Sequence, residues 1–166
     1  TKIITTATTL TISNALATFQ GVRRRFSFQI RNEKLVYIDD YAHHPTEINA
    51  VHQAVRELYP NKKIIACFQP HLFSRTKDFV DGFAESLSQF DEILLLEIYP
   101  ARELPIEGVN SSWLLEKITN KNKQLVTKEK LLTYFKNSDA DVYISIGAGD
   151  IGEMVKDIKK VLNEKN

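Results

Sequence analysis

The feature that most constrains this chain is the alternation of short, mainly apolar runs with amphipathic stripes at helical spacing. The runs predict strands at 35–38, 64–68, 93–98, 124–126 and 142–146. The stripes that follow them predict helices around 48–58, 79–90, 113–118, 131–135 and 151–162. Strands that are apolar on both faces and alternate with helices indicate a parallel sheet covered on both sides. The predicted fold class is therefore α/β, a Rossmann-like doubly wound domain with a mostly parallel sheet.

The first 21 residues differ from this pattern. Residues 1–11 are rich in threonine, and Ile12, Ala15, Leu16 and Phe19 then recur at helical spacing before Gly21. Residues 22–30, basic at first and then alternating between apolar and polar, predict a strand. We therefore place a boundary between residues 21 and 22.

Composition excludes several classes of function. A net charge of +1 argues against a broad electrostatic grip on nucleic acid or on an anionic membrane, and no apolar run approaches the roughly 20 residues that span a bilayer. The single cysteine, Cys67, lies in an apolar run, which fits a buried thiol in a reducing, cytoplasmic setting. The chain begins at Thr1 without a methionine, so we expect a fragment of a longer protein.

A dense polar segment, 39–45, follows the strand at 35–38. It carries two carboxylates, a phenol, two imidazoles and a proline that opens the next helix: Asp39, Asp40, Tyr41, His43, His44 and Pro45. Ligands of open α/β sheets bind beyond the carboxyl ends of strands, and a helix N-terminus there favours phosphate or carboxylate. The acids are expected to orient an imidazole, hold a ribose hydroxyl or support Mg²⁺ through water. The alternative is that these groups only cap backbone atoms.

A second polar segment, 68–77, follows the next strand and contains His71, Arg75 and Lys77. Ser74 or Thr76 is expected to cap the helix after it, which puts Arg75 and Lys77 at a helix start, where cations oppose the dipole. Such cations are better explained by an anionic ligand than by helix stability. The alternative is a pair of solvated surface charges.

A third segment, 147–152, matches Gly-x-Gly-x-x-Gly. The dinucleotide fingerprint belongs on a first βαβ unit, whereas here the chain ends after the helix, so we interpret the glycines as allowing close backbone approach at a domain or ligand contact. The basic run Arg23, Arg24 and Arg25 lacks interleaved aromatic residues, which favours a hinge or interface over nucleic acid. The sequence contains no Gly-x-x-x-x-Gly-Lys-Ser/Thr phosphate loop.

Together these segments resemble the C-terminal domain of Mur ligases. Residues 14–26 look like the junction between the central and C-terminal domains, and segments 39–45, 68–77, 99–103 and 147–152 follow in matching order. Within the family, Phe-Gln-Pro-His followed by Ser-Arg-Thr is similar to the member that joins L-alanine to UDP-N-acetylmuramate. One departure is Leu72, where some relatives have arginine; Arg102 is then a candidate to assist Arg75.

The resemblance implies ATP-dependent ligation in peptidoglycan synthesis. ATP phosphorylates the muramyl carboxylate, and the amine of L-alanine then displaces phosphate through a tetrahedral intermediate. ATP and Mg²⁺ would be bound mainly by a central domain, which accounts for the missing phosphate loop. Residues 1–21 would be a remnant of that domain and 22–166 the C-terminal domain, so the partners are the three substrates and the enzyme's own N-terminal and central domains. The isolated chain is expected to be inactive.

The resemblance also implies roles for individual residues. His43 and Arg75 are expected to be catalytic, and Tyr41, His43, His71 and Arg75 to contact substrate. Asp40 and His44 are expected to contact the nucleotide or the start of the helix, and no metal ligand is expected in this domain. Two other functions stay open: a stand-alone Rossmann-like module that binds a nucleotide at 147–152, and an interaction domain in which the His-His segment is only a cap.

Overall fold

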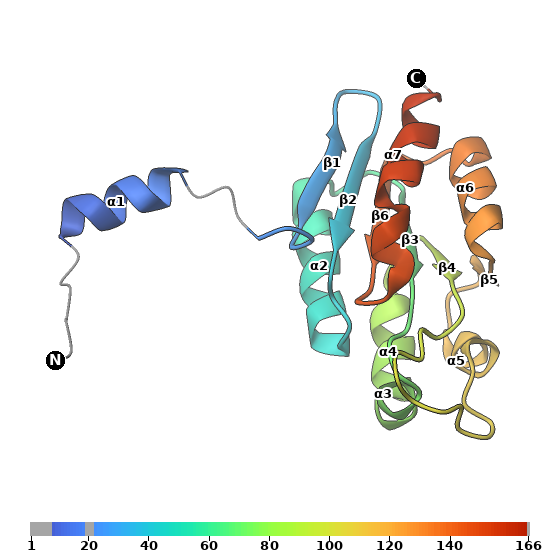
Figure 1. The fold of residues 1–166 in the computed structure, drawn as a ribbon. Helices are drawn as coiled ribbons and strands as arrows, with labels where there is room; N and C mark the ends of the chain where they lie inside the picture. The colour runs from blue at the N-terminus through green and yellow to red at the C-terminus, as the bar shows by residue number, and fades with distance from the viewer. Residues whose placement is uncertain (1–7, 19–21, 166) are drawn as a thin grey trace, which may run out of the picture.

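The computed structural model describes residues 8–18 and 22–165 and confirms the predicted α/β class (Figure 1). Six strands form one sheet in the order β1-β2-β6-β3-β4-β5. Their bounds are β1 Ser27–Arg31, β2 Val36–Asp40, β3 Ile64–Phe68, β4 Glu92–Leu95, β5 Lys123–Leu125 and β6 Val142–Ile146. Strands β2, β6, β3, β4 and β5 are parallel to one another. Strand β1 pairs with β2 in the antiparallel direction, which makes the sheet mixed.

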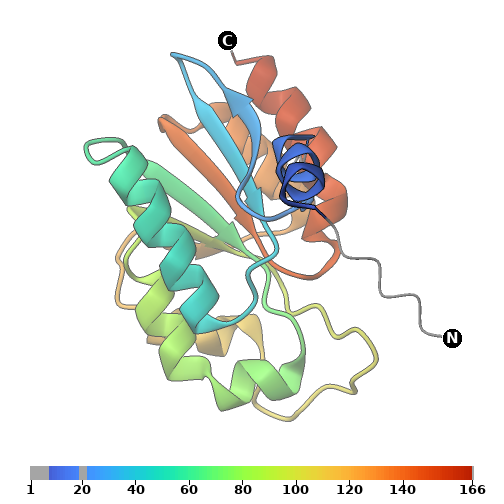
Figure 2. The ribbon, with the colours of Figure 1, turned by 90° about the vertical axis from the view of Figure 1, so that its left-hand side faces the viewer.

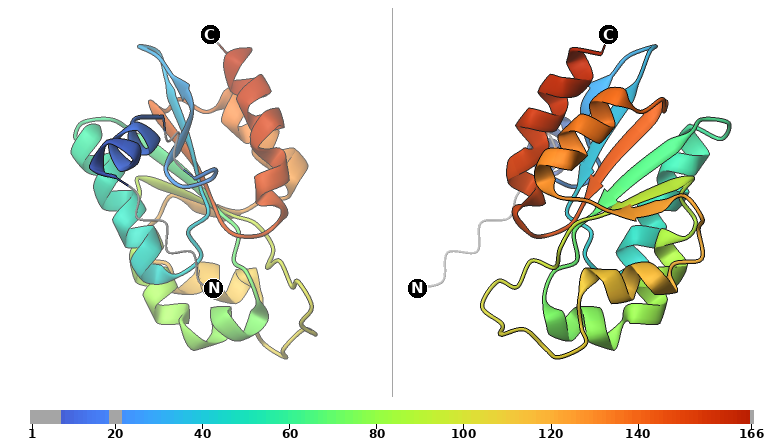
Figure 3. Two further views of the ribbon diagram at one scale, coloured as in Figure 1. Left: turned by 60° about the vertical axis from the view of Figure 1, so that its left-hand side comes forward. Right: turned by 90° about the vertical axis from the view of Figure 1, so that its right-hand side faces the viewer.

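Helices cover both faces of the sheet, as Figures 2 and 3 show. Their bounds are α2 Pro45–Leu58, α3 Phe73–Asp78, α4 Val80–Leu87, α5 Ser111–Lys117, α6 Lys128–Asn137 and α7 Val155–Asn163, with a 3₁₀ turn, η1, at Asp150–Met154. Alternate residues of each strand point to opposite faces. One core therefore joins Ile38 and Ile144 to α2, α4 and α5, and the other joins Tyr37 and Tyr143 to α6 and α7.

Local sequence explains most of these elements. Pro45 stands at the start of α2, and the predicted stripe buries Ile48, Val51 and Val55 against the sheet. Thr127 caps α6 as a side-chain acceptor for the Lys130 N–H. The cap of α5 is Asn110, one residue before the serines at 111 and 112 that begin the helix.

Two predicted elements differ most from the structure in their bounds. The strand expected over 22–30 begins only at Ser27, because Arg24 and Phe26 adopt positive φ angles of 59° and 46° and form a turn. The helix expected around 79–90 was to be capped by Ser74 or Thr76. A separate short helix, α3, precedes it and ends before Phe79, so Ser74 and Thr76 lie inside α3 and do not cap α4.

Residues Thr9–Thr18 form helix α1, which extends away from the sheet in Figure 1. Leu10 and Leu16 on this helix are 71% and 68% exposed. The predicted stripe is thus helical as far as the structure describes it, while Phe19 and Gly21 lie outside the described residues. None of the helices described is both long enough and apolar enough to cross a bilayer.

Candidate functional site

Three segments that are distant in the sequence start side by side at the carboxyl edge of the sheet. The strand register pairs Asp40 with Ile146 and Ile146 with Phe68, so β2, β6 and β3 end in one row. Backbone hydrogen bonds continue across this row: the Gly147 N–H donates to the Asp40 carbonyl at 3.1 Å, and the Gln69 N–H to that of Ile146 at 3.0 Å. The three polar segments predicted from sequence therefore share one edge.

Segments 39–45 and 68–77 do not follow adjacent strands of the sheet. Because β6 lies between β2 and β3, the glycine segment 147–152 follows the strand between them. Side chains nevertheless reach across this gap, since the rings of His43 and His71 lie 6.3 Å apart between centroids.

The two carboxylates of the first segment belong to β2 and point into the domain. Asp39 is fully buried, with Oδ1 accepting from the Ser145 hydroxyl and Oδ2 paired with Arg24. Asp40 accepts from the backbone N–H groups of Ala42 and Phe26 at 2.7 and 2.6 Å. Burial raises the pKa of Asp40, although these two hydrogen bonds act in the opposite direction. Asp40 thus caps backbone groups, as the alternative interpretation held, and its contact with a nucleotide stays a prediction.

His43 is oriented by its own segment and by the first turn of α2. Its Nδ1 lies 3.0 Å from the carbonyl oxygen of Tyr41 and 3.3 Å from Glu47 Oε2. Because both of those atoms are acceptors, Nδ1 carries a proton. A neutral His43 therefore has Nε2 as its acceptor, and this nitrogen can take a proton from a substrate.

Glu47 ties this segment to the basic run. Its carboxylate accepts from the His43 N–H at 2.8 Å and lies 3.7 Å from Arg25. Burial raises the pKa of Glu47, but the hydrogen bond from His43 and the charges of His43 and Arg25 outweigh it, so the pKa lies below its usual value. Glu47 is therefore an anion that steadies His43, a role that the sequence analysis missed.

His44 faces away from this arrangement. Its Nδ1 lies 3.0 Å from the Thr46 hydroxyl, and its ring packs edge-on against Phe79 with 4.5 Å between centroids. Its side chain makes no capping hydrogen bond at the start of α2. The contact of His44 with a nucleotide stays a prediction.

In the second segment, His71 and Arg75 form a pair. Nη1 of Arg75 lies 3.3 Å from Nδ1 of His71, and an arginine can only donate, so Nδ1 is the acceptor and the proton of the neutral ring is on Nε2. Burial lowers the pKa of His71, and the positive charges of Arg75 and His43 lower it further. His71 is therefore a neutral ring at pH 7 whose Nε2 donates a hydrogen bond, whereas Nε2 of a neutral His43 accepts one.

The helix-dipole argument for Arg75 and Lys77 is wrong. Both lie in the last turn of the short helix α3, where a cation is favourable for the helix. Arg75 is instead distinguished by its partners, because among the described residues it forms no ion pair with a carboxylate and contacts a neutral imidazole. Its guanidinium is available to an anion.

The loop between β4 and α5 holds α3 in place. Glu103 accepts from the N–H of Ser74 at 3.0 Å and from its hydroxyl at 2.5 Å. These bonds, followed by the charge of Arg75, lower the pKa of Glu103. Tyr99 stacks on His71 at 5.7 Å between ring centroids and is bridged to it by backbone pairing. Arg102 is exposed on the same loop, and its assistance to Arg75 stays a prediction.

Leu72, noted as a departure from some relatives, adopts a φ of 75°, which is uncommon for a residue with a side chain. Its N–H donates to the Tyr99 carbonyl at 2.9 Å, and its own carbonyl accepts from Thr76. These bonds hold the strained backbone between His71 and α3.

The glycines of the third segment make room for protein atoms. A Cβ at Gly149 would lie 2.7 Å from Tyr99, and one at Gly147, where φ is 145°, would lie 2.7 Å from the Gln69 carbonyl. Gln69 in turn accepts from the Ile151 N–H and donates to Asp150, at 2.8 and 2.7 Å. The close backbone approach predicted for this segment is thus a contact within the domain.

The described residues include no group of three or more His, Cys, Asp or Glu side chains arranged to hold a metal ion. Both carboxylates at the end of β2 are occupied by contacts within the domain, so they are poorly placed to bind Mg²⁺.

A cavity of about 640 Å³ lies elsewhere, between β5 and α6, and is lined by residues such as Leu125, Thr133 and Tyr134. It is lined by none of the site residues predicted from the sequence. We place the candidate site at the carboxyl edge, because the convergent cation and imidazoles are there.

Known proteins match this chain over most of its length. Residues 24–155 match the family model described as Mur ligase, glutamate ligase domain. The chain is 74% identical over 157 residues, 95% of its length, to a UDP-N-acetylmuramate–L-alanine ligase from Flavobacterium psychrophilum. It is 71% identical over 153 residues, 92% of its length, to the ligase of that name from Flavobacterium johnsoniae.

These matches cover 35% and 34% of the relatives, so the chain spans about a third of the length of the curated relatives it matches. A solved UDP-N-acetylmuramate-alanine ligase from Thermotoga maritima has a TM-score of 0.70 and 28% identity, covering 92% of this chain and 33% of that one.

Proposed function

The chain belongs to the Mur ligase family and corresponds to the C-terminal domain of its members. We propose that it is the C-terminal domain of an ATP-dependent ligase that joins L-alanine to UDP-N-acetylmuramate. The observation that carries this proposal is the open edge where Arg75 and two imidazoles converge while the nearby carboxylates turn inward. This edge leaves Arg75 without an ion pair among the described residues, because the carboxylates of Glu47 and Glu103 are bonded to other groups. It suits substrates that bring their own negative charge, as the alanine carboxylate and an acyl phosphate do.

The proposed reaction has two steps. The γ-phosphoryl group of ATP passes to the muramyl carboxylate, releasing ADP. The alanine amine, once it has lost a proton from its ammonium form, attacks the acyl carbon, and phosphate leaves as the amide forms. Positioning and stabilisation of developing negative charge are what a protein contributes to such chemistry.

The residues of this edge suit the second step. Arg75 is proposed to bind the alanine carboxylate or the transferring phosphate, and His71 to donate a hydrogen bond from Nε2 to the same anionic group. His43 is proposed to accept the ammonium proton at Nε2, since its Nδ1 is held by the Tyr41 carbonyl and Glu47. Tyr41, 37% exposed beside His43, is proposed to contact the substrate with its ring.

ATP and Mg²⁺ are proposed to be held mainly by a central domain that precedes this chain. Asp40 and His44 remain the candidate nucleotide contacts within it. Two observations support a second domain: the sequence carries no phosphate loop, and α1 exposes Leu10 and Leu16, which suits a helix that packs on a neighbour. Residues 1–21 are then the remnant and linker and 22–166 the C-terminal domain. A cytoplasmic location follows from the ATP that the reaction consumes.

The test compares the complete protein with the 166-residue chain. The gene is expected to encode a phosphate loop upstream in the same reading frame. The complete product is expected to release phosphate only when ATP, Mg²⁺, UDP-N-acetylmuramate and L-alanine are all present, with each omission as a control. The chain alone is expected to show no turnover. Absence of alanine-dependent phosphate release by the complete protein contradicts the proposed function, and turnover by the chain alone contradicts the need for the other domains.

A further inference from the structure

Arg24 is bonded to several groups at the carboxyl edge and is not an ordinary surface charge. Its side chain is 23% exposed, its Nε donates to Asp39 at 2.9 Å, and its Nη2 donates to the Gly147 carbonyl at 2.7 Å. Its guanidinium also lies 5.2 Å from the centre of the Tyr41 ring, and its own carbonyl accepts from the Tyr41 N–H at 2.7 Å. One residue thus joins β2 to the first and third polar segments.

A buried chain of hydrogen bonds holds Arg24 in this position. Asp39 is 0% exposed and has Arg24 on one oxygen and the Ser145 hydroxyl on the other, at 2.9 and 2.7 Å. Ser145 is also 2.9 Å from the hydroxyl of Tyr37, and burial raises the pKa of that hydroxyl, so it stays protonated. A buried carboxylate without a cation is strongly unfavourable, so Asp39 requires Arg24 as much as it orients it.

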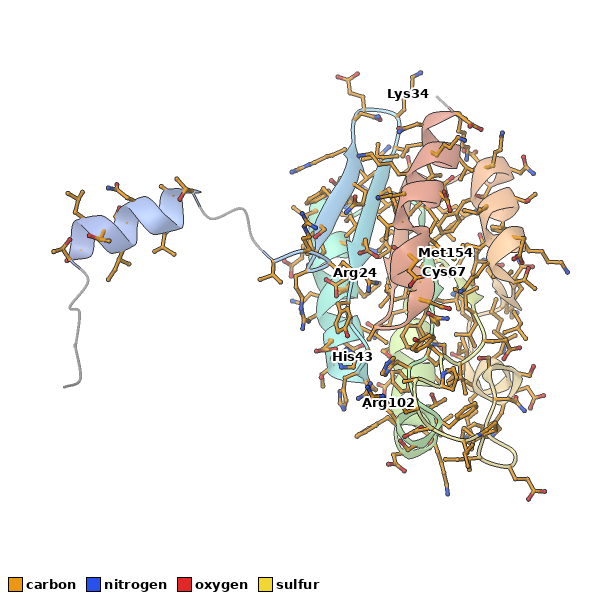
Figure 4. The ribbon with its side chains drawn as sticks, viewed as in Figure 1. Arg24, Lys34, His43, Cys67, Arg102 and Met154 are labelled. Atoms are coloured by element: carbon orange, nitrogen blue, oxygen red, sulfur yellow. The ribbon has the colours of Figure 1, made fainter. Side chains whose placement is uncertain are left out.

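The backbone around Arg24 is also adapted to this contact. Arg24 has a φ of 59° and lies shortly before β1, and it is labelled above His43 in Figure 4. A Cβ at Gly152 would lie 2.5 Å from Cζ of Arg24, so a glycine there leaves the space that the guanidinium fills. The third glycine of the Gly-x-Gly-x-x-Gly pattern therefore accommodates an arginine of this chain.

We propose that Arg24 is a positioning residue for the candidate site. It fixes Tyr41 from above its ring and through its backbone, and it fixes the glycine segment through Gly147. Arg24 thereby holds the segment that carries His43 against segment 147–152. Arg24 acts through these neighbours and does not itself touch the reacting groups. This inference rests on the proposed function for its effect on catalysis, but its effect on the two segments is independent of that function.

The test uses two variants with a matched control. Arg24→Lys keeps the charge but cannot donate to Asp39 and the Gly147 carbonyl in the geometry of a guanidinium. Gly152→Ala keeps every charge and displaces the guanidinium. Arg23→Lys makes the same chemical change as the first variant at an exposed neighbour. In the complete ligase, assayed well below each variant's Tm, the first two are expected to lower kcat roughly 10- to 100-fold at saturating substrate and the control less than about twofold.

A second measurement separates this inference from the proposed function. Amide hydrogen exchange in the 166-residue chain is expected to accelerate in peptides that cover 39–44 and 145–149 for both variants, and to stay at the wild-type rate for the control. If the wild-type ligase proves inactive but exchange changes in this way, the proposed reaction fails and the positioning role stands. A lower Tm with unchanged kcat, KM and exchange overturns the positioning role, as does failure of both variants to fold.

Discussion

The two edges of the sheet use charge in different ways. At the amino edge, two carboxylates each bind a cation and a backbone N–H: Asp91 binds Arg56 and the Ile64 N–H, both at 2.8 Å. Asp141 likewise binds Lys62 at 2.8 Å and the Lys63 N–H at 2.9 Å. The charges of Asp91 and Asp141 are balanced within the domain, so these two carboxylates contribute to stability and not to ligand binding.

At the carboxyl edge, the balance is incomplete. The carboxylates of Asp39 and Asp40 are consumed by Arg24 and by backbone groups, while Arg75 is left with an uncharged partner, His71. The comparison places the expected substrate beside a guanidinium whose side-chain partner is an uncharged imidazole, and not simply where polar residues are dense.

The sharpest test of this difference replaces one arginine at each edge by alanine. In the complete ligase, Arg75→Ala is expected to raise the KM for L-alanine and lower kcat, with a combined loss in kcat/KM of roughly 100-fold or more, because a charge-assisted contact to substrate and transition state is lost. Arg56→Ala is the matched control and is expected to lower Tm while kcat/KM stays within about twofold. Equal kinetic losses from the two variants would contradict the comparison.

A second prediction separates the adjacent histidines. His43→Gln is expected to lower kcat about 10- to 100-fold, because an acceptor for the ammonium proton is lost. His44→Gln is expected to leave kcat within about threefold, and any effect is expected on the KM for ATP. Steady-state kinetics with each substrate varied in turn measure both. A larger loss of kcat in the His44 variant would reverse the assignment.

At the amino edge, the expected effect is on stability. Asp91→Ala removes the acceptor for both Arg56 and the Ile64 N–H, and we expect a loss of about 1–2 kcal/mol in the free energy of unfolding. Asp91→Asn keeps an oxygen acceptor and is expected to lose about half as much. Urea unfolding of the 166-residue chain measures both values. A loss no larger for alanine than for asparagine would show that the backbone contact is unimportant.

The smallest expected effect is a pair of pKa changes. Burial and then a neighbouring arginine lower the pKa of two histidines below 6.5, with Arg75 acting on His71 and Arg56 on His52. By NMR titration of the chain, Arg75→Ala is expected to raise the pKa of His71 alone, and Arg56→Ala that of His52 alone. A common shift in both variants would indicate a general change in the fold.

The same histidines give a direction for stability. A lowered pKa in the folded state means that the unfolded state binds the proton more readily. The stability that neutral His71 and His52 contribute is therefore present above pH 6.5 and is lost as the pH falls through 6.5 toward their folded-state pKa values. Denaturation curves at pH 7.5 and 5.5 measure the combined direction.

Sequence predicted best where burial alone decides the structure. The runs 64–68 and 142–146 are strands with the predicted bounds, because they are apolar on both faces. It predicted worst where tertiary contacts override local pattern: Asp39 and Asp40 continue β2 because Arg24, Ser145 and backbone groups satisfy them inside the domain. The break between α3 and α4 falls at Phe79, where neither glycine nor proline indicates it in the sequence.

For the site, sequence identified the three segments but not their arrangement. The order that places β6 between β2 and β3 is a long-range pairing with no local signal. Glu47 and Glu103 were missed for the same reason, since their partners His43 and Ser74 are recognisable only in space. A Glu four residues after a histidine at a helix start was the one available signal for Glu47.

The most direct test of the central claim is a crystal structure of the complete ligase with L-alanine, UDP-N-acetylmuramate and a non-hydrolysable ATP analogue. The account predicts the alanine carboxylate, or the terminal phosphate beside it, at roughly 2.7–3.2 Å from the Arg75 guanidinium, with the alanine amine facing Nε2 of His43. Alanine bound away from both residues, for example in the cavity between β5 and α6, with Arg75 in contact with neither anion, would contradict it.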